Sequence, residues 1–338
     1  MRTGKHEWVA RACAYTRLTW LLERMPQRQV LIILNYHRIG DAAHTPYDPG
    51  VFSATAEEFA AQIAYIKNRF HIATLEESLA MIDGGGPPGA SVLITFDDGY
   101  IDNYSLAFPV LRSHGLQAVF FLTTAFVGTG HLPWWDTVAY IVKQSRTNLI
   151  RLRYPEPATF DLEQIGVSQA TMQILRLYKK TSMKDHERFC GELEAACKTS
   201  RPQGDIERCF MNWEEVREMH RAGMAFGSHT HTHPILTTLA AQQQQTEFGI
   251  SRAILEHELG TRIDVLAYPV GARHAFSAES ILGLKNTGYR AAFSFYGGVN
   301  CPGKMQPFDM RRNDVGHQSY SRLRLQTAIG ALTAARWF

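Results

Sequence analysis

Two short polar segments hold the residues whose types and spacing suit hydrolytic chemistry. The first is Thr95-Phe96-Asp97-Asp98-Gly99, in which two adjacent carboxylates follow an apolar run and precede a glycine. Adjacent residues at a strand end point in different directions, so one carboxylate can bind a metal ion while the other accepts a proton from water. A surface turn without function would have the same sequence, and this segment alone does not decide between the two readings.

The second segment is Ser228-His229-Thr230-His231-Thr232-His233-Pro234. His229 and His233 can reach one metal ion whether the segment is a helical turn or extended, because both repeats return to the same face. One core histidine bound to backbone is common, but three in so short a segment are not explained by packing. Neutral imidazoles with hydrogen-bonding neighbours are typical zinc ligands. We therefore interpret this segment as part of a metal site.

The two segments together predict a catalytic metal centre. One Asp and two His leave open positions on Zn²⁺ or a similar divalent ion, as in catalytic sites. Such an ion polarises a carbonyl group and lowers the pKa of bound water, and the second carboxylate takes the proton of that water.

The elements expected around these segments alternate along the chain. The sequence predicts strands at 29–36, 91–96, 118–122, 224–227, 265–267 and 291–295, and helices at 55–69, 74–83, 105–114 and 239–259. Strand–helix alternation with apolar strands is typical of an α/β fold with a parallel sheet or barrel. Both polar segments then follow the carboxyl ends of strands, where such folds build their active sites.

One stretch interrupts the alternation. From about 131 to 204 the pattern is mostly helical and lacks a convincing buried strand, which predicts a helical insertion. Trp134 and Trp135 near its start either line a sugar groove or anchor the insertion to the core, since large aromatic side chains dominate burial wherever they lie. The sequence favours neither reading.

Composition excludes several classes of protein. The chain has 338 residues, of which 45% are hydrophobic and 20% charged, as in ordinary globular domains. A net charge of +3 is too small to indicate a nucleic-acid partner. The five cysteines are odd in number and form no C-x-x-C pair, so we expect free thiols in a reducing compartment.

The N-terminal segment carries scattered arginines and no uninterrupted apolar core, so we expect neither a secretory signal nor a membrane span, and a soluble cytoplasmic protein. Residues 9–24 are typical of a basic amphipathic helix that includes Trp20, Leu21 and Leu22. Such a helix either packs against its own domain or makes a peripheral contact with an anionic membrane surface.

The Thr-Phe-Asp-Asp-Gly segment followed by His-Thr-x-x-His resembles the polysaccharide deacetylases of the NodB-homology type, carbohydrate esterase family 4. The resemblance covers roughly Val30 to Asp314, apart from the insertion. It implies a distorted (β/α)7 barrel with Asp97 as catalytic base and Asp98, His229 and His233 as ligands of a divalent metal, Zn²⁺ above all, with Co²⁺ or Ni²⁺ as alternatives.

The sequence departs from that family in its third motif, where Ala267 stands in place of the arginine that would orient the base. Arg311 or Arg312 could supply that group from elsewhere in the chain. Other residues that we expect to contact substrate are Tyr268, Pro269, Gly271, Trp135 and Arg311.

The family's late Leu-x-x-x-x-His motif, the source of the general acid, is also not found near the C-terminus. His37, in Leu34-Asn-Tyr-His-Arg38, follows a predicted strand, as in deacetylases that act on poly-N-acetylglucosamine. We expect His37 to protonate the leaving amine. The alternative is a histidine that only caps a loop.

These readings predict two parts, an N-terminal helical segment at 1–28 and a barrel domain at 29–338 with the insertion at about 131–204. The predicted function is metal-dependent hydrolysis of an N-acetyl group from an N-acetylated sugar, polysaccharide or glycolipid, with release of acetate. The alternatives are a hydrolase of another small linear or cyclic amide, and a carbohydrate-binding member without catalysis.

Overall fold

The computed structural model describes residues 3–181, 185–202, 208–316 and 319–333. Within those limits the chain forms two compact units. The first contains the described residues within Met1–Gly40, Phe52–Gly128 and Phe210–Phe338, and the second contains those within Asp41–Val51 and Thr129–Cys209. All the sequence-predicted strands and helices outside the insertion belong to the first unit.

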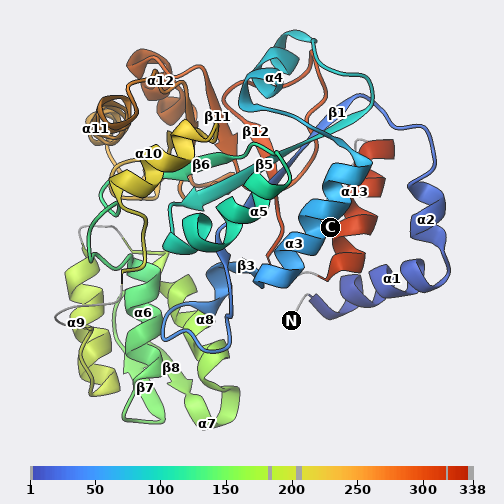
Figure 1. Ribbon diagram of the computed structural model, residues 1–338. Helices are drawn as coiled ribbons and strands as arrows, with labels where there is room; N and C mark the ends of the chain where they lie inside the picture. Colours follow the sequence, from blue (N-terminus) through green and yellow to red (C-terminus); the bar gives the residue numbers. More distant parts are fainter. Residues whose placement is uncertain (1–2, 182–184, 203–207, 317–318, 334–338) are drawn as a thin grey trace. The chain divides into compact units, whose positions relative to one another are not determined.

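The first unit is built on a closed ring of seven parallel strands (Figure 1). In ring order they are β1 (Val30–Tyr36), β12 (Met310–Asp314), β11 (Ala291–Ser294), β10 (Val265–Ala267), β9 (Ala225–Ser228), β6 (Val119–Leu122) and β5 (Ala90–Asp98), which pairs again with β1. The short β4 (His71–Ile72) pairs in parallel with Ser91 and Val92, near the start of β5. The expected (β/α)7 barrel is confirmed.

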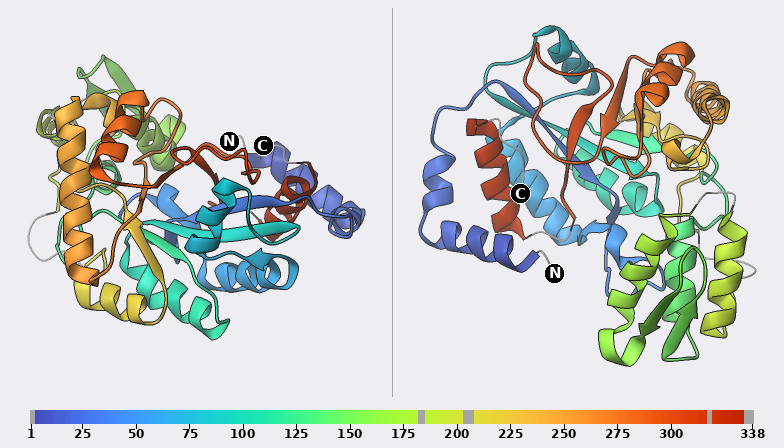
Figure 2. Two further views of the ribbon diagram at one scale, coloured as in Figure 1. Left: turned by 90° about the horizontal axis from the view of Figure 1, so that it is seen from above. Right: turned by 180° about the vertical axis from the view of Figure 1, so that it is seen from behind.

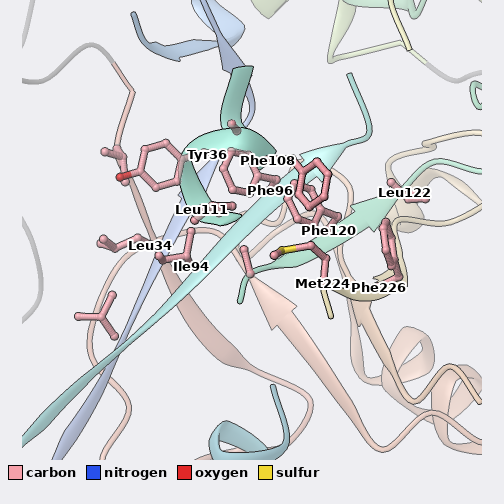
Figure 3. Packing of buried hydrophobic residues seen from close by; sticks show 14 of the residues in the cluster. Leu34, Tyr36, Ile94, Phe96, Phe108, Leu111, Phe120, Leu122, Met224 and Phe226 are labelled. Carbon is pink, nitrogen blue, oxygen red and sulfur yellow. The ribbon is translucent and has the colours of Figure 1, made fainter. Parts of the chain in front are cut away.

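The strands bury both faces, and their residues alternate between two apolar layers. On β1, Ile32, Leu34 and Tyr36 belong to the layer between barrel and helices, while Leu31 and Ile33 belong to the layer inside the barrel. Figure 3 shows the outer layer, where Phe96 stacks on Phe120 with ring centroids 4.8 Å apart. This burial explains the continuous apolar runs in the sequence.

Helices surround the barrel in both views of Figure 2. They are α3 (Ala56–Arg69), α4 (Leu75–Ala80) with the 3-10 turn η2 (Met81–Asp83), the π-helical η3 (Asn103–Ala107) with α5 (Phe108–Ser113), α10 (Trp213–Arg221), α11 (Ala241–Leu259), α12 (Ala278–Thr287) and α13 (Tyr320–Thr333). Several begin at a capping box, such as Thr55 with Glu58 on α3 and Asn212 with Glu215 on α10, which satisfies the first backbone N–H groups. Smaller elements are the pair β2 (Arg38–Ile39) and β3 (Phe52–Ala54) and the 3-10 turn η5 (Leu236–Thr238).

The second unit is not purely helical. Its helices are α6 (Trp134–Lys143), α7 (Leu162–Ile165), α8 (Val167–Tyr178) and α9 (His186–Cys197), with the 3-10 turn η1 (Pro49–Val51). It also contains an antiparallel hairpin of β7 (Leu149–Leu152) and β8 (Ala158–Asp161), which the sequence did not indicate. Each strand has four residues, and on β7 Arg151 is exposed between buried neighbours, so neither resembles a buried strand.

The N-terminal segment forms two helices instead of one. They are α1 (Thr3–Tyr15) and α2 (Leu18–Leu22), and the break falls at Arg17, whose φ of 61° is left-handed. Both helices contact α13. None of the described helices is long and apolar enough to cross a membrane. None of the five cysteines, all of which lie in the described ranges, forms a disulfide.

Candidate functional site

The two adjacent carboxylates lie at the carboxyl end of β5, inside the ring of strands. The alternation that turns Leu93 into the barrel also turns Thr95 and Asp97 inward. At Asp98 the backbone adopts a φ of 73°, so the strand ends and the second carboxylate takes a different direction. Gly99 continues the turn at a φ of 88°, where a Cβ would lie only 2.8 Å from Leu122. The local backbone therefore separates the two carboxylates, as the sequence predicts.

The histidines reach Asp98 from the loop after β9. The Nε2 atoms of His229 and His233 each lie 3.5 Å from Oδ1 of Asp98. Their ligand atoms all lie within 4.8 Å of one another, and the three residues are buried. The loop is a tight turn, neither helical nor extended, because Thr230 and His233 have φ values of 67° and 60°. The Thr230 hydroxyl accepts a hydrogen bond from the His233 amide at 3.1 Å, which closes that turn.

Burial keeps both imidazoles neutral. It lowers the pKa of His229 to about 4, although the nearby Asp97 carboxylate opposes the shift. Burial and the neighbouring His229 also place the pKa of His233 well below its usual value. Nδ1 of His229 lies 2.8 Å from the Ala267 carbonyl, so this nitrogen carries the proton and donates it there.

The donor set fits a divalent metal ion. Asp98 offers a carboxylate oxygen, and the hydrogen bond to Ala267 leaves the Nε2 lone pair of His229 directed at the group. One carboxylate and two neutral imidazoles suit Zn²⁺ and related ions, and three protein ligands leave positions for water and substrate. Asp98, His229 and His233 could therefore hold such an ion.

Asp97 lies beside this group in a dense polar network. Its two oxygens accept bidentate hydrogen bonds from Arg312 at 2.6 and 2.8 Å, and Oδ2 accepts a third from Asn35 at 3.0 Å. Arg312 also donates to Oδ1 of Asn35, which in turn accepts from Thr95. Burial opposes ionisation of Asp97, but the guanidinium of Arg312 outweighs it and holds the pKa of the carboxyl well below its usual range. Asp97 is thus an oriented carboxylate, with Oδ2 3.9 Å from Nε2 of His229.

The orienting arginine comes from a strand that the sequence did not indicate. Of the two candidates, Arg312 binds Asp97, whereas Arg311 lies near the ring of Tyr296. Both belong to β12, whose sequence Met-Arg-Arg-Asn-Asp lacks the apolar alternation of a strand. Parallel pairing with β1 and β11 brings Arg312 to the barrel interior, where it is fully buried. The group missing from the third motif is therefore supplied across the barrel.

His37 follows β1 and faces the same end of the barrel. Its Nε2 lies 3.9 Å from Oδ2 of Asp97. Its backbone is fixed on both sides, because the amide donates to Ser53 Oγ at 2.9 Å and the carbonyl accepts from Asn103 Nδ2 at 2.7 Å. The ring is partly exposed. His37 therefore has both a defined position next to Asp97 and access from outside.

Three of the residues expected to contact substrate, Tyr268, Pro269 and Gly271, lie directly after β10. The Tyr268 side chain faces the outer layer, where it stacks on Phe276 and its hydroxyl donates to the Phe308 carbonyl. Its amide donates to the Phe293 carbonyl, so among the sequence-predicted residues the backbone of Gly271 is the better candidate for a substrate contact. Pro269 has no N–H group.

Trp135 lies in the second unit, where it is 5% exposed and packs edge-on against Trp134 with ring centroids 5.2 Å apart. Trp134 in turn stacks on Tyr178 of the same unit, with ring centroids 4.5 Å apart. A side chain with so little exposed surface offers a ligand few contacts.

The loop after β9 has a support that sequence reasoning missed. Glu247, on α11, accepts hydrogen bonds from the amides of His231 and Thr232 and from the Thr232 hydroxyl, at 2.7 to 2.8 Å. His231 is not part of the three-residue group, and its Nδ1 lies 2.9 Å from the Thr124 hydroxyl. Both contacts hold the loop in place without reaching the centre.

Comparison with known proteins gives matches in family, sequence and structure. A family model described as polysaccharide deacetylase matches residues 84–147 and 158–292, more than half of the chain. YxkH of Bacillus subtilis (strain 168) is 22% identical over 275 residues, which cover 80% of this chain and 66% of that protein, just under two thirds of its length. A poly-β-1,6-N-acetyl-D-glucosamine N-deacetylase of Staphylococcus aureus (strain MSSA476) is 25% identical over 208 residues, 58% of this chain and 70% of that protein.

Solved structures share the fold. IcaB from Ammonifex degensii superposes with a TM-score of 0.58 at 20% identity, covering 89% of this chain and 97% of that one. A de-N-acetylase from Aggregatibacter actinomycetemcomitans gives a TM-score of 0.55 at 16% identity, covering 88% and 99%. At these identities the likeness concerns the fold.

Proposed function

The chain belongs to the polysaccharide deacetylase family, and we propose that it hydrolyses the N-acetyl groups of an N-acetylated polysaccharide and releases acetate. A sequence relative that is named as an N-deacetylase of poly-β-1,6-N-acetyl-D-glucosamine supports this class of substrate. An N-acetylated glycan attached to a lipid carries the same acetamide group and belongs to the same class.

One observation carries the proposal. At one end of the barrel, the Asp98–His229–His233 group lies beside an ionised Asp97 that Arg312 holds at 2.6 and 2.8 Å. Amide hydrolysis needs an electrophilic centre and an oriented base within reach of one water molecule. The juxtaposition of these two groups supports that chemistry.

We assign Asp98, His229 and His233 as the residues that would hold a divalent ion, with Zn²⁺ favoured by the mixed imidazole and carboxylate donors. When bound, such an ion supplies Lewis acidity, which polarises the acetamide carbonyl and acidifies water. The chain's own part is to keep both imidazoles neutral by burial and to fix His229 through Ala267.

Asp97 accepts the proton of the water that attacks the carbonyl carbon. Arg312 and Asn35 hold the carboxylate so that one oxygen faces the reaction while the guanidinium keeps it ionised. The carbonyl oxygen gains negative charge in this step, and the amide of Gly271 is a candidate donor to it. Glycine is required at position 271 because its φ is 59° and a Cβ there would lie 2.6 Å from Cβ of Phe295.

His37 supplies the proton for the leaving group. Its Nε2 lies 3.9 Å from Oδ2 of Asp97, so the proposed acid and the proposed base are neighbours. The C–N bond breaks as the nitrogen receives this proton, and the acetic acid that forms gives its own proton to the amine, so the products are acetate and an ammonium group on the sugar. Asp97 then releases its proton to solvent and His37 takes one up from solvent, which restores both groups for the next turnover.

The proposal is tested by measuring acetate release from a panel of substrates. The panel contains β-1,6-linked N-acetylglucosamine oligomers, other N-acetylated glycans and small cyclic and linear amides, each with chelator and with added Zn²⁺ or Co²⁺. We expect metal-restored release from at least one glycan. Release from small amides alone would favour another amide hydrolase, and no release from a metal-loaded protein would favour a binding role.

A further inference from the structure

The two N-terminal helices bury small and polar side chains and expose large apolar ones. On α1, Ala10 is fully buried, while Trp8 and Tyr15 are 71% and 91% exposed. On α2, Thr19 is 1% exposed, while its neighbours Leu18 and Trp20 are exposed. A surface helix that serves only its own domain has the opposite arrangement. These helices therefore present an apolar face that the domain's core does not use.

Exposed large apolar side chains are clustered in this part of the chain. Of the twelve large apolar side chains that are exposed in the described part of the chain, seven lie between residues 8 and 25, namely Trp8, Val9, Tyr15, Leu18, Trp20, Leu21 and Met25. We call these seven the N-terminal apolar patch. Figures 1 and 2 show α13 between α3 and the α1–α2 pair, so the patch lies at an edge of the first unit. Single exposed apolar residues are normal, whereas a cluster marks an interaction surface.

The surface around the patch is basic. Its exposed cations are Lys5, Arg11, Arg17, Arg24 and Arg28. The two carboxylates within residues 3–28 are both engaged by arginines: Glu7 lies 3.5 Å from Arg11, and Glu23 lies 2.7 Å from Arg324. The guanidinium of Arg24 lies over the Trp20 ring, 3.6 Å from its centroid. Cationic and aromatic groups thus alternate over one surface that has little opposing negative charge.

A pocket of about 390 Å³ opens on this surface, lined by Ala14, Arg17, Thr19, Trp20 and Arg324. The Thr19 hydroxyl is buried there and has no hydrogen-bond partner among the described residues. The exposed guanidinium of Arg17 is a donor suited to phosphate oxygens, whereas the guanidinium of Arg324 is held by Glu23. The pocket therefore offers a phosphate-binding position next to exposed indole and aliphatic side chains.

We propose that α1 and α2 bind the surface of an anionic phospholipid bilayer, with the N-terminal apolar patch in the interfacial layer and the surrounding cations on lipid phosphates. Trp and Tyr favour the boundary between water and lipid, and long basic side chains reach from apolar surroundings to charged headgroups. With 13 and 5 residues, the helices lie on the membrane and do not cross it.

Charge selects the lipid surface over a second copy of the chain. Two copies that met through this face would bring one set of five cations against another, whereas an anionic membrane complements them. The inference concerns where the protein resides, and it stands independently of the proposed deacetylation.

The test is co-sedimentation of the full chain with vesicles of phosphatidylcholine alone or with about one third phosphatidylglycerol, a composition that makes the surface strongly anionic. We expect binding to the anionic vesicles, weakening with salt, and a blue shift of tryptophan fluorescence. The pair W8S/W20S should weaken binding by at least about tenfold, because it removes two interfacial indoles. The pair R17Q/R24Q should weaken it by about 25-fold, since each cation near such a surface contributes about fivefold.

Matched controls alter exposed residues of the first unit elsewhere. L282S removes an exposed leucine on α12, and R262Q/R290Q removes two exposed cations beside Asp264. Both should bind as the wild type does, and all variants should keep the wild-type circular dichroism. The proposal is overturned if anionic vesicles bind no better than neutral ones, or if the controls weaken binding as much as the patch variants. It is also overturned if ultracentrifugation finds a dimer that W8S/W20S dissociates, because the patch is then an interface between copies.

Discussion

Replacing Arg312 by methionine isolates the contribution of the buried ion pair that orients Asp97. The side chain of Arg312 is fully buried, and its Nη1 and Nη2 atoms bind the two oxygens of Asp97. Methionine fills a similar volume without charge, so Asp97 keeps its burial and loses its counter-charge. The neighbouring Arg311→Met is the matched control, because Arg311 lies on the same strand and contacts Tyr296 instead.

The expected cost of Arg312→Met is about 3–5 kcal/mol of unfolding free energy at pH 7, the range for removing one partner of a buried pair. The direction in which this cost changes with pH follows from the pKa of Asp97. In the wild type the pKa of Asp97 is depressed, so its contribution is present above the unfolded value near 3.9 and lost as pH falls below it. In the variant, burial raises that pKa, so the stability difference from the wild type grows as pH rises from about 4 to 7.

Urea unfolding, with chelator in every sample, measures this cost for the wild type, both arginine variants, Asp97→Asn and the double variant D97N/R312M. The double variant should lose less unfolding free energy than the two single variants Asp97→Asn and Arg312→Met lose together. The difference should be about 2 kcal/mol or more, because no charge is then left buried alone. Additive losses would refute the reasoning. So would a loss for Arg312→Met that matches the one for Arg311→Met, or a loss that does not change with pH.

Four further outcomes follow from the site. His233→Ala should weaken Zn²⁺ binding in calorimetry by at least about tenfold, while His231→Ala keeps it, and equal losses would contradict the ligand assignment. His37→Gln should lower kcat for acetate release by about 10²–10⁴ with bound metal unchanged; near wild-type turnover would remove His37 from the mechanism. Glu247→Ala should cost about 1–3 kcal/mol of stability by leaving loop donors unsatisfied, and an unchanged urea midpoint would show that the loop holds without it. Because burial lowers the pKa of His229 to about 4 from about 6.5 in the unfolded chain, the metal-free protein should lose stability as pH falls from about 6.5 toward 4, and urea titrations that stay flat across that interval would contradict its neutral state.

Much of the barrel could be predicted because its strands are buried on both faces. Continuous apolar runs mark β1, β5 and β6, and the predicted strand at 265–267 agrees with β10 at both ends. The same regularity predicted that Asp97 and Asp98 follow a strand, and that the histidine segment follows another. The spacing of the two motifs therefore predicts which residues form the centre.

The rest of the site depends on pairing across the barrel, which leaves no local signal. β12 is polar because its inward Arg312 serves Asp97, so it lacks the apolar alternation by which strands are recognised. Glu247 lies in a helical pattern that follows four glutamines, where a carboxylate looks solvated. The break between α1 and α2 rests on a left-handed Arg17, a conformation for which arginine carries no sequence preference.

The central claim is that Asp97 acts as base beside the Asp98–His229–His233 group in deacetylation. Its most direct test is acetate release from a β-1,6-linked N-acetylglucosamine oligomer by the wild type and Asp97→Asn at equal Zn²⁺ content. The account predicts steady release by the wild type and a rate lower by at least about 10² in the variant. Release by Asp97→Asn within a few-fold of the wild type would contradict it.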